Sequence, residues 1–181
     1  MKPERMARKI IYQSPWVNLY LDKVKFPAGR IIDEYHLLNF DTEAVAAVIV
    51  NEKQQILMIE AYRYPTDSIE WEIPSGGIDQ GETVLEAAKR EAFEETGYEV
   101  GDLEPVYSFY PSNGNSNQRF HVVYCKAVRK LSETYDLNEV KGFRWFGLDD
   151  IRRMIKNREL NDGFTLTALL LYLTAAAADA D

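Results

Sequence analysis

The stretch that most constrains this chain is residues 76–98, GGIDQGETVLEAAKREAFEETGY, which combines a glycine-bearing turn, a helix start and several glutamates. Thr83 followed by Glu86 has the spacing of a capping box, and Gly97 stands where a helix would end. The residues between these ends are good helix formers without a proline. The pattern therefore predicts a helix over residues 84–96.

Glu91, Glu94 and Glu95 are the carboxylates that this helix brings together. Spacings of three and four residues put them within a sector of about 100° on one helix face. Like charges this close repel one another by roughly a few tenths of a kcal/mol per pair unless a cation lies among them. Oxygen ligands suit hard ions, so the sequence predicts a Mg²⁺ site, with Mn²⁺ as a substitute. An acidic, solvated helix face is the plainer alternative.

The same stretch resembles the signature of the Nudix family, Gly-x5-Glu-x7-Arg-Glu-U-x-Glu-Glu-x-Gly-U, in which U is a bulky apolar residue. The residues that fill its fixed positions are Gly76, Glu82, Arg90, Glu91, Glu94, Glu95 and Gly97. Ala92 and Tyr98, at the U positions, are small and aromatic where the family prefers aliphatic residues. Because so many defined positions rarely coincide by chance, the match is specific.

The resemblance implies an α+β fold, an α/β/α Nudix sandwich with a mixed sheet, and an enzyme that hydrolyses phosphorus anhydrides. The metal ligands that it implies are the carbonyl oxygen of Ser75 and the carboxylates of Glu91, Glu94 and Glu95. Arg90 would hold these glutamates in place through ion pairs, with Glu82 or Glu86 as its counter-charge. We therefore expect Arg90 and Glu82 to belong to the catalytic site.

Composition limits the partners of this chain. Its 181 residues, 46% apolar and 28% charged, are typical of one globular core with an appendage. The net charge of −8 opposes binding to nucleic acid or acidic membranes, so a phosphate-bearing ligand would need local arginines and bound metal. Cys125 is the only cysteine, which fits a reducing, cytoplasmic setting. The longest apolar run, residues 44–50, is far short of the roughly 20 residues of a membrane span, and residues 1–9 are not followed by the apolar region of a signal peptide. We therefore expect a soluble protein that is not exported.

The N-terminal region has the alternating pattern of strands. Apolar and polar residues alternate over residues 9–13, 17–26 and 31–39, and proline-containing breaks separate these pieces. The pattern predicts a small N-terminal antiparallel sheet, which we assign to a domain of residues 1–41 ahead of a catalytic domain of residues 42–181.

Such a small sheet is marginally stable alone, so it is expected to pack on a partner. The resemblance to the ADP-ribose pyrophosphatase branch of the Nudix family implies the same, because that branch exchanges an N-terminal sheet within a homodimer. Trp16 is the aromatic residue that we expect to stack on a nucleobase, in the active site of the other subunit. Packing in the dimer interface is the alternative for Trp16.

Substrate contacts are predicted just before the glycine turn. Residues 43–50 and 56–62 have the pattern of central strands. The segments that follow, Arg63-Tyr-Pro65 and residues 71–76, resemble those of nucleoside diphosphate sugar pyrophosphatases. We expect Arg63 and Glu70 to contact phosphate or sugar. The alternative for Arg63 is a surface ion pair with Glu70 or Glu72.

The general base is the least constrained residue. The family often places an acidic residue in the loop that here ends at Gln118, and a neutral amide cannot accept a proton. Gln118 is therefore predicted to contact substrate only. Glu139, in a polar segment before the strand of residues 143–146, is the predicted base, with Glu133 and Asp136 as alternatives.

Together these features predict a Mg²⁺-dependent nucleoside diphosphate sugar pyrophosphatase. It would split ADP-ribose or a related small sugar nucleotide into a nucleoside monophosphate and a sugar phosphate. One alternative is a pyrophosphohydrolase that removes unwanted nucleoside triphosphates. Another is a non-catalytic Nudix module that senses a nucleotide, although a pure sensor need not keep three crowded carboxylates.

Overall fold

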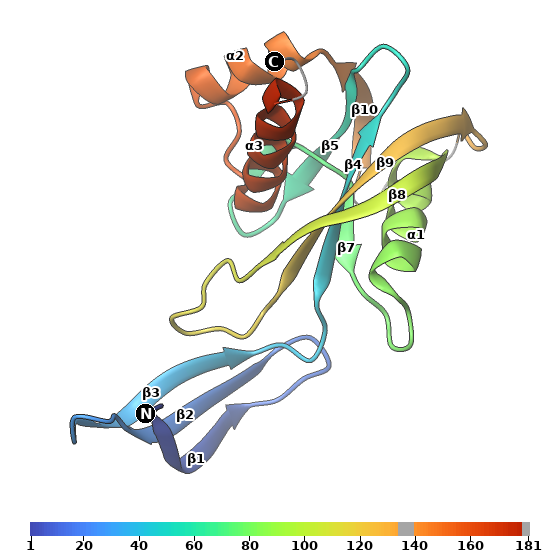
Figure 1. Ribbon diagram of the computed structural model, residues 1–181. Coiled ribbons are helices and arrows are strands. Elements are labelled where there is room, and N and C mark those ends of the chain that lie inside the picture. The colour runs from blue at the N-terminus through green and yellow to red at the C-terminus, as the bar shows by residue number, and fades with distance from the viewer. Residues whose placement is uncertain (134–139, 179–181) are drawn as a thin grey trace. The chain divides into compact units, whose positions relative to one another are not determined.

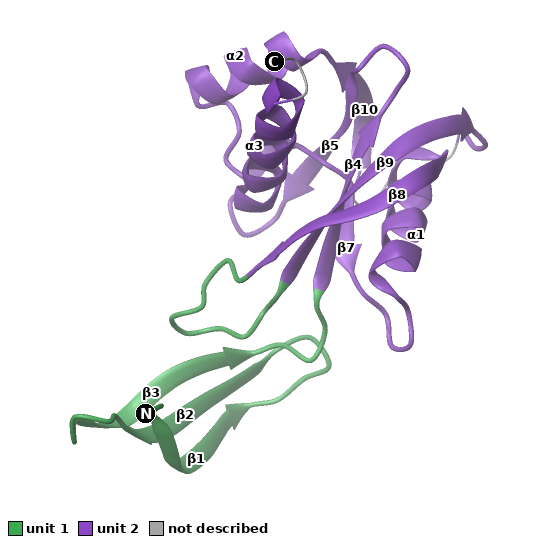
Figure 2. Ribbon diagram, in the orientation of Figure 1, with its two compact units in different colours: residues 1–43, 110–119 green, residues 44–109, 120–181 purple. Residues whose placement is uncertain are grey.

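A computed structural model of the protein describes residues 1–133 and 140–178. Glu139 and Asp136, two of the candidate bases, lie outside the described residues. The chain forms two compact units, one of residues 1–43 and 110–119 and one of residues 44–109 and 120–181 (Figure 2). The domain division after residue 41 stays a prediction.

The first unit contains an antiparallel sheet of three strands, β1 (Glu4–Tyr12), β2 (Asn18–Lys25) and β3 (Ile31–Asn39), in that order (Figure 1). Gly29 makes the turn from β2 to β3, where its φ of 88° suits glycine. The sheet confirms the prediction from alternating residues. Every residue of β1 is exposed, so this edge strand has little cover within its own unit.

The second unit is built on a mixed sheet of seven strands. These strands are β4 (Ala44–Val50), β5 (Ile56–Arg63), β6 (Ser68–Glu72), β7 (Ser75–Gly77), β8 (Tyr98–Phe109), β9 (Phe120–Lys130) and β10 (Val140–Phe146). Their order is β10-β5-β4-β9-β8, with β6 beside β5 and β7 beside β4. Only β4 and β9 run parallel among the described pairs.

Helices cover both faces of this sheet (Figure 1). Alternation along β4 decides which face each side chain meets: Val45, Ala47 and Ile49 pack with helix α1 (Val84–Thr96). The intervening Ala46, Val48 and Val50 pack on the side of α2 (Leu148–Asn157) and α3 (Gly163–Ala178). The result is the predicted α+β sandwich with a mixed sheet, and the predicted fold class is confirmed.

Two short strands escaped the sequence pattern, and a third strand, β8, is irregular. β6 and β7 are too short to show alternation, and β8 starts at Tyr98, directly after the Gly97 that ends α1. Register shifts between Gly101 and Glu104, with Asp102 at a φ of 47°, break the alternation in the first part of β8. No helix within residues 1–133 and 140–178 is long and apolar enough to cross a membrane.

Candidate active site

Helix α1 has the two predicted ends. The Glu86 backbone N–H donates to Thr83 Oγ1 at 3.2 Å, and the Thr83 N–H donates to Glu86 Oε2 at 2.8 Å, which completes the capping box. Gly97 ends the helix at a φ of 72°, and a Cβ there would lie 2.2 Å from the Ser132 carbonyl oxygen. Because Glu86 is engaged in the cap, the counter-charge of Arg90 comes from elsewhere.

Arg90 is the centre of an ion-pair network on this helix. Its Nε and Nη2 each donate to Glu82 at 3.0 Å, and Nη1 donates to Glu91 at 2.7 Å and to Glu94 at 3.1 Å. Nη2 also donates to the Gly77 carbonyl oxygen at 2.7 Å, which ties the helix to the end of strand β7. The hydrogen bonds with Glu82 are the largest cause of a raised Arg90 pKa and a lowered Glu82 pKa. One guanidinium therefore fixes three of the predicted glutamates.

Glu91 and Glu95 lie against strand β7. Both are nearly buried, with 8% and 4% of their surface exposed, and the Ser75 N–H donates to Glu95 Oε2 at 2.9 Å. A Cβ on Gly76 would lie only 2.0 Å from Glu91 Oε1, so no larger residue fits there without moving the carboxylate. β7 itself is paired with β4, and this pairing sets where the glutamates meet the backbone.

The donor set fits a hard divalent cation. It consists of carboxylates on one helix face and the peptide oxygens of the adjoining glycine-bearing strand, all of them oxygen ligands. Glu94 is the most accessible of the predicted ligands, with 53% of its side chain exposed. Within the described residues, no group of three or more His, Cys, Asp or Glu side chains is already gathered closely enough to hold an ion. The roles of Ser75, Glu91, Glu94 and Glu95 as ligands stay predictions.

Arg63 forms a two-fold hydrogen-bonded ion pair with Glu72. Nε donates to Oε1 at 2.8 Å and Nη2 donates to Oε2, while Glu72 has only 1% of its surface exposed. From the sequence alone, an ion pair with Glu70 or Glu72 was the alternative role for Arg63. The pair is formed with Glu72, but the Glu72 carboxylate is buried and not on the surface. Glu72 is the largest cause of the raised Arg63 pKa, and the charges of Asp162 and Glu95 act in the same direction. Of the helix carboxylates, Glu95 thus contributes to the raised pKa of Arg63.

A pocket of about 560 Å³ opens beside this ion pair, lined by Arg63, Glu70, Asn161 and Asp162 among others. The Asn161 amide donates to both carboxylate oxygens of Glu70, at 3.2 and 3.0 Å. Asp162 accepts a hydrogen bond from the Thr165 N–H at 2.7 Å and so caps α3. Asn161 was not predicted, because it reaches Glu70 from 91 positions away and no local pattern marks it.

The remaining predicted residues lie elsewhere. Trp16 is 83% exposed and stands in the connection between β1 and β2, where its backbone N–H donates to Ser14 Oγ. Gln118 belongs to the same compact unit, in its loop of residues 110–119. Glu133 forms an ion pair with Lys130 at 2.5 Å. The assigned roles of Trp16, Gln118 and the candidate bases stay predictions.

Residues 41–166 match the NUDIX domain family. The chain belongs to the Nudix family. It is thus a Nudix pyrophosphohydrolase, a hydrolase that acts on phosphoanhydrides, and this family generally uses a divalent metal. The signature of residues 76–98, which includes α1, is the part of the sequence that resembled this family.

Named relatives agree on the family. ADP-ribose pyrophosphatase of Bacillus subtilis (strain 168) is 28% identical over 171 residues, which cover 93% of this chain and 91% of that protein. Methanol dehydrogenase activator of Bacillus methanolicus is 30% identical over 161 residues, covering 88% and 86%. The crystal structure of an ADP compounds hydrolase superposes with a TM-score of 0.88 over 99% of this chain and 96% of that one, at 22% identity. This Nudix protein therefore shares its whole fold with that hydrolase.

Proposed function

We propose that this Nudix hydrolase is a Mg²⁺-dependent nucleoside diphosphate sugar pyrophosphatase that cleaves ADP-ribose or a related sugar nucleotide. The products would be a nucleoside monophosphate and a sugar phosphate. The full-length similarity to a protein named ADP-ribose pyrophosphatase supports this substrate class. The observation that carries the proposal is the pocket with Arg63, Glu70 and Asn161 in its wall. Besides the hydrogen bonds with Glu72, the charge of Glu95 on the carboxylate helix contributes to the raised pKa of Arg63.

The pocket offers complementary groups to the two parts of such a substrate. Arg63 uses Nε and Nη2 on Glu72, and its Nη1 donates to no described residue, so that nitrogen can donate to a phosphate oxygen. Glu70 and Asn161 present a carboxylate and an amide, which suit the hydroxyl groups of a sugar. A diphosphate would then extend from Arg63 toward the face that carries Glu95.

Within the helix, Arg90 would keep Glu91 and Glu94 oriented while the glutamates and the Ser75 carbonyl hold the ion. When bound, Mg²⁺ supplies positive charge to the diphosphate and polarises the attacking water. The new bond joins the water oxygen to one phosphorus, and the bridging P–O bond breaks. The departing phosphate leaves with the bridging oxygen.

The water's proton needs an acceptor, and Glu139 is our proposed base. We expect Glu139→Gln to lower kcat by about 10²-fold while substrate affinity changes only a few-fold, as for loss of a general base. If Glu133→Gln or Asp136→Asn lowers kcat and Glu139→Gln does not, the assignment moves to that residue. If all three variants stay active, the base belongs to the α1 helix.

We further propose that the protein works as a homodimer built on its N-terminal sheet. Met6, Ile10 and Ile11 are exposed on β1, an edge strand that has little cover within its unit. Trp16 would stack on the nucleobase and Gln118 would contact substrate. Light scattering at micromolar concentration should give the mass of two chains, and a fully active monomer would rule the dimer out.

The deciding experiment is an assay of products. Purified protein is incubated with Mg²⁺ and, separately, ADP-ribose, GDP-mannose, other sugar nucleotides and nucleoside triphosphates, and each product is identified by mass spectrometry. We expect AMP and ribose 5-phosphate from ADP-ribose. Cleavage of triphosphates alone would favour the house-cleaning alternative, and cleavage of no compound in the panel would contradict the proposed substrate class.

A further inference from the structure

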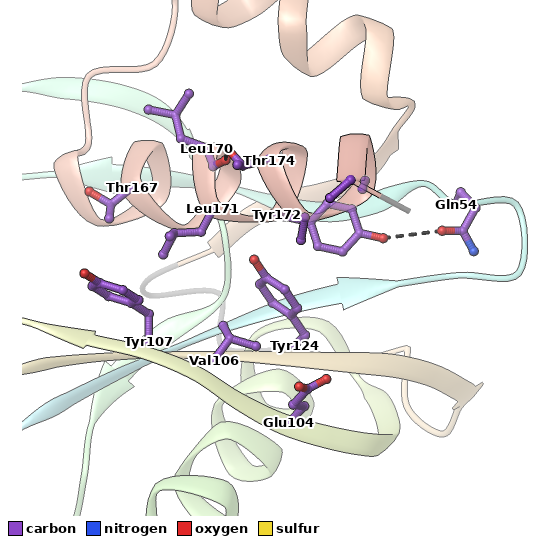
Figure 3. A pocket seen from close by; sticks show the side chains of 13 residues that line it. Gln54, Glu104, Val106, Tyr107, Tyr124, Thr167, Leu170, Leu171, Tyr172 and Thr174 are labelled. Atoms are coloured by element: carbon purple, nitrogen blue, oxygen red, sulfur yellow. Dashed lines mark hydrogen bonds between the residues drawn. The ribbon is translucent and has the colours of Figure 1, made fainter. Parts of the chain in front are cut away.

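A second hollow lies on the face of the seven-stranded sheet that α1 does not cover. Helix α3 forms one wall and strands β8 and β9 form the other, and the space between them measures about 940 Å³ (Figure 3). Pockets for small molecules range from roughly 300 to 1,000 Å³. The hollow is therefore large enough for such a molecule and lies apart from the carboxylate helix.

An irregular strand creates this hollow. Val106 and Tyr107 are consecutive, yet both line it, which strict alternation along a strand would forbid. A register shift between Pro105 and Tyr107 explains the exception, because it turns Tyr107 toward the same face as Val106. On the opposite wall, α3 contains no charged residue over its whole length, and Leu170 remains 45% exposed. The hollow thus has an apolar wall that the described residues leave open.

Three tyrosines give the hollow aromatic surfaces with polar tips. Tyr124 and Tyr172 meet edge to face with ring centroids 5.1 Å apart, and Tyr107 is 55% exposed (Figure 3). The Tyr172 hydroxyl donates to Gln54 Oε1 at 3.4 Å, whereas the Tyr124 hydroxyl forms no hydrogen bond with a described residue. Burial raises the pKa of Tyr124 to about 12, so its hydroxyl stays protonated and can donate.

Charge makes the hollow selective. A neighbouring hollow of about 580 Å³ shares Glu104 and Tyr124 with it, so the two adjoin. There, Lys126 is paired with Asp102 at 2.9 Å, whereas neither Glu104 nor Glu52 has an ion-pair partner among the described residues. The described C-terminal turn of α3, which has no basic residue, adds the partial negative charge of its carbonyl groups. These charges attract a cation and repel a phosphate.

We propose that this hollow is a second ligand site, which binds a small aromatic amine. The flat ring would lie against Tyr107 and Tyr124 beneath Leu170 of α3, and the ammonium group would reach the Glu104 carboxylate. The Tyr124 hydroxyl is available to a polar atom of the ring. This site does not depend on which sugar nucleotide the Nudix centre cleaves.

The experiment uses tryptamine as the probe and indole-3-propionate, an acid of similar size, as its charge-reversed counterpart. The amide resonances of the ¹⁵N-labelled full chain are followed during titration with each compound. We expect tryptamine to shift resonances of β8, β9 and α3 in a saturable way, with a dissociation constant on the order of 0.1–1 mM for so small a ligand. Indole-3-propionate should bind at least tenfold more weakly.

Glu104→Gln keeps the shape of the site and removes its charge. We expect this variant to bind tryptamine about tenfold more weakly, as for the loss of one charge-assisted hydrogen bond. Glu99→Gln is the matched control, because Glu99 is also on β8 but is paired with Arg129 and does not line the hollow. That variant should bind tryptamine as the wild type does.

Four outcomes would overturn the proposal. Tryptamine that causes no saturable shifts in β8, β9 or α3 excludes the site, and equal affinity for the amine and the acid excludes the role of charge. Unchanged tryptamine binding by Glu104→Gln excludes the assigned contact. Light scattering tests whether a second copy of the chain, and not a small molecule, occupies the hollow. A dimer that Leu170→Arg converts to a monomer would show that a second chain covers this face.

Discussion

The two faces of the seven-stranded sheet are built in different ways. On the α1 face, Ala87, Ala88 and Ala92 are fully buried, so the helix backbone can come close to the sheet. On the other face, part of α3 stands away from β8 and β9 and the large hollow remains. Small residues thus let α1 bring its carboxylates against the glycine-bearing strand, whereas an open space remains between α3 and the strands β8 and β9.

The two faces of the sheet also carry different chemical groups. The face with close packing holds carboxylates that are fixed by Arg90 and by β7, a rigid arrangement that suits catalysis. The open face holds tyrosines and Glu104, which suit a ligand. Substitutions made in matched pairs, one on each face or at neighbouring positions, can separate these roles.

The largest expected effect comes from Glu95→Gln, which keeps the side chain's size but removes a predicted ligand charge. We expect turnover in saturating Mg²⁺ to fall by at least ~10²-fold while the circular dichroism spectrum is unchanged. Glu99→Gln on β8 is the control, and its turnover should match the wild type. Nearly normal turnover by Glu95→Gln would contradict the metal assignment.

Gly76→Ala tests how closely α1 approaches β7. The added methyl would lie 2.0 Å from Glu91 Oε1, so the carboxylate must move. We expect turnover to fall by roughly tenfold or more, because small displacements of catalytic groups are costly. At Gly77 a Cβ would meet no atom within 4 Å, so Gly77→Ala should change turnover no more than a few-fold. Equal turnover for the two variants would show that Glu91 adapts freely.

Ala88→Leu and Ala175→Leu compare packing on the two faces directly. Ala88 is completely buried, so leucine there should lower the free energy of unfolding by about 1–3 kcal/mol. Ala175 lines the hollow, where leucine should change that free energy by less than about 0.5 kcal/mol. Urea denaturation measures both values, and a similar loss at the two sites would mean that both faces are tightly packed.

The smallest expected effect is a pH dependence from Glu82, whose pKa is lowered mainly by its hydrogen bonds with Arg90. A lowered pKa in the folded state means that the ion pair stabilises the fold above the ordinary value of 4.5 and that this contribution is lost as pH falls through the folded pKa. The Tm difference between wild type and Glu82→Gln, measured with a chelator, should therefore shrink between pH 6 and pH 3. A constant difference would show that Glu82 acts only through packing.

The sequence by itself determined helix α1 and the family. The capping box, Gly97 and the spacing of the glutamates lie within one short segment, and helix geometry converts spacing directly into position. The first and last residues of the helix agree with the prediction for the same reason. From the sequence, either Glu82 or Glu86 could pair with Arg90. The structure decides between them, because Glu86 accepts a hydrogen bond from Thr83 in the helix cap and Glu82 accepts one from Arg90.

Only the tertiary structure decided the contacts between distant segments. Asn161 reaches Glu70, Glu91 meets Gly76, and Tyr107 joins the wall of the hollow because of how strands are registered and shifted. A shift of one residue in a strand moves a side chain to the other face of the sheet. Local sequence patterns carry too little information to fix such shifts, so the carboxylate helix could be predicted from the sequence, whereas the pocket at Arg63 and the tyrosine-lined hollow could not.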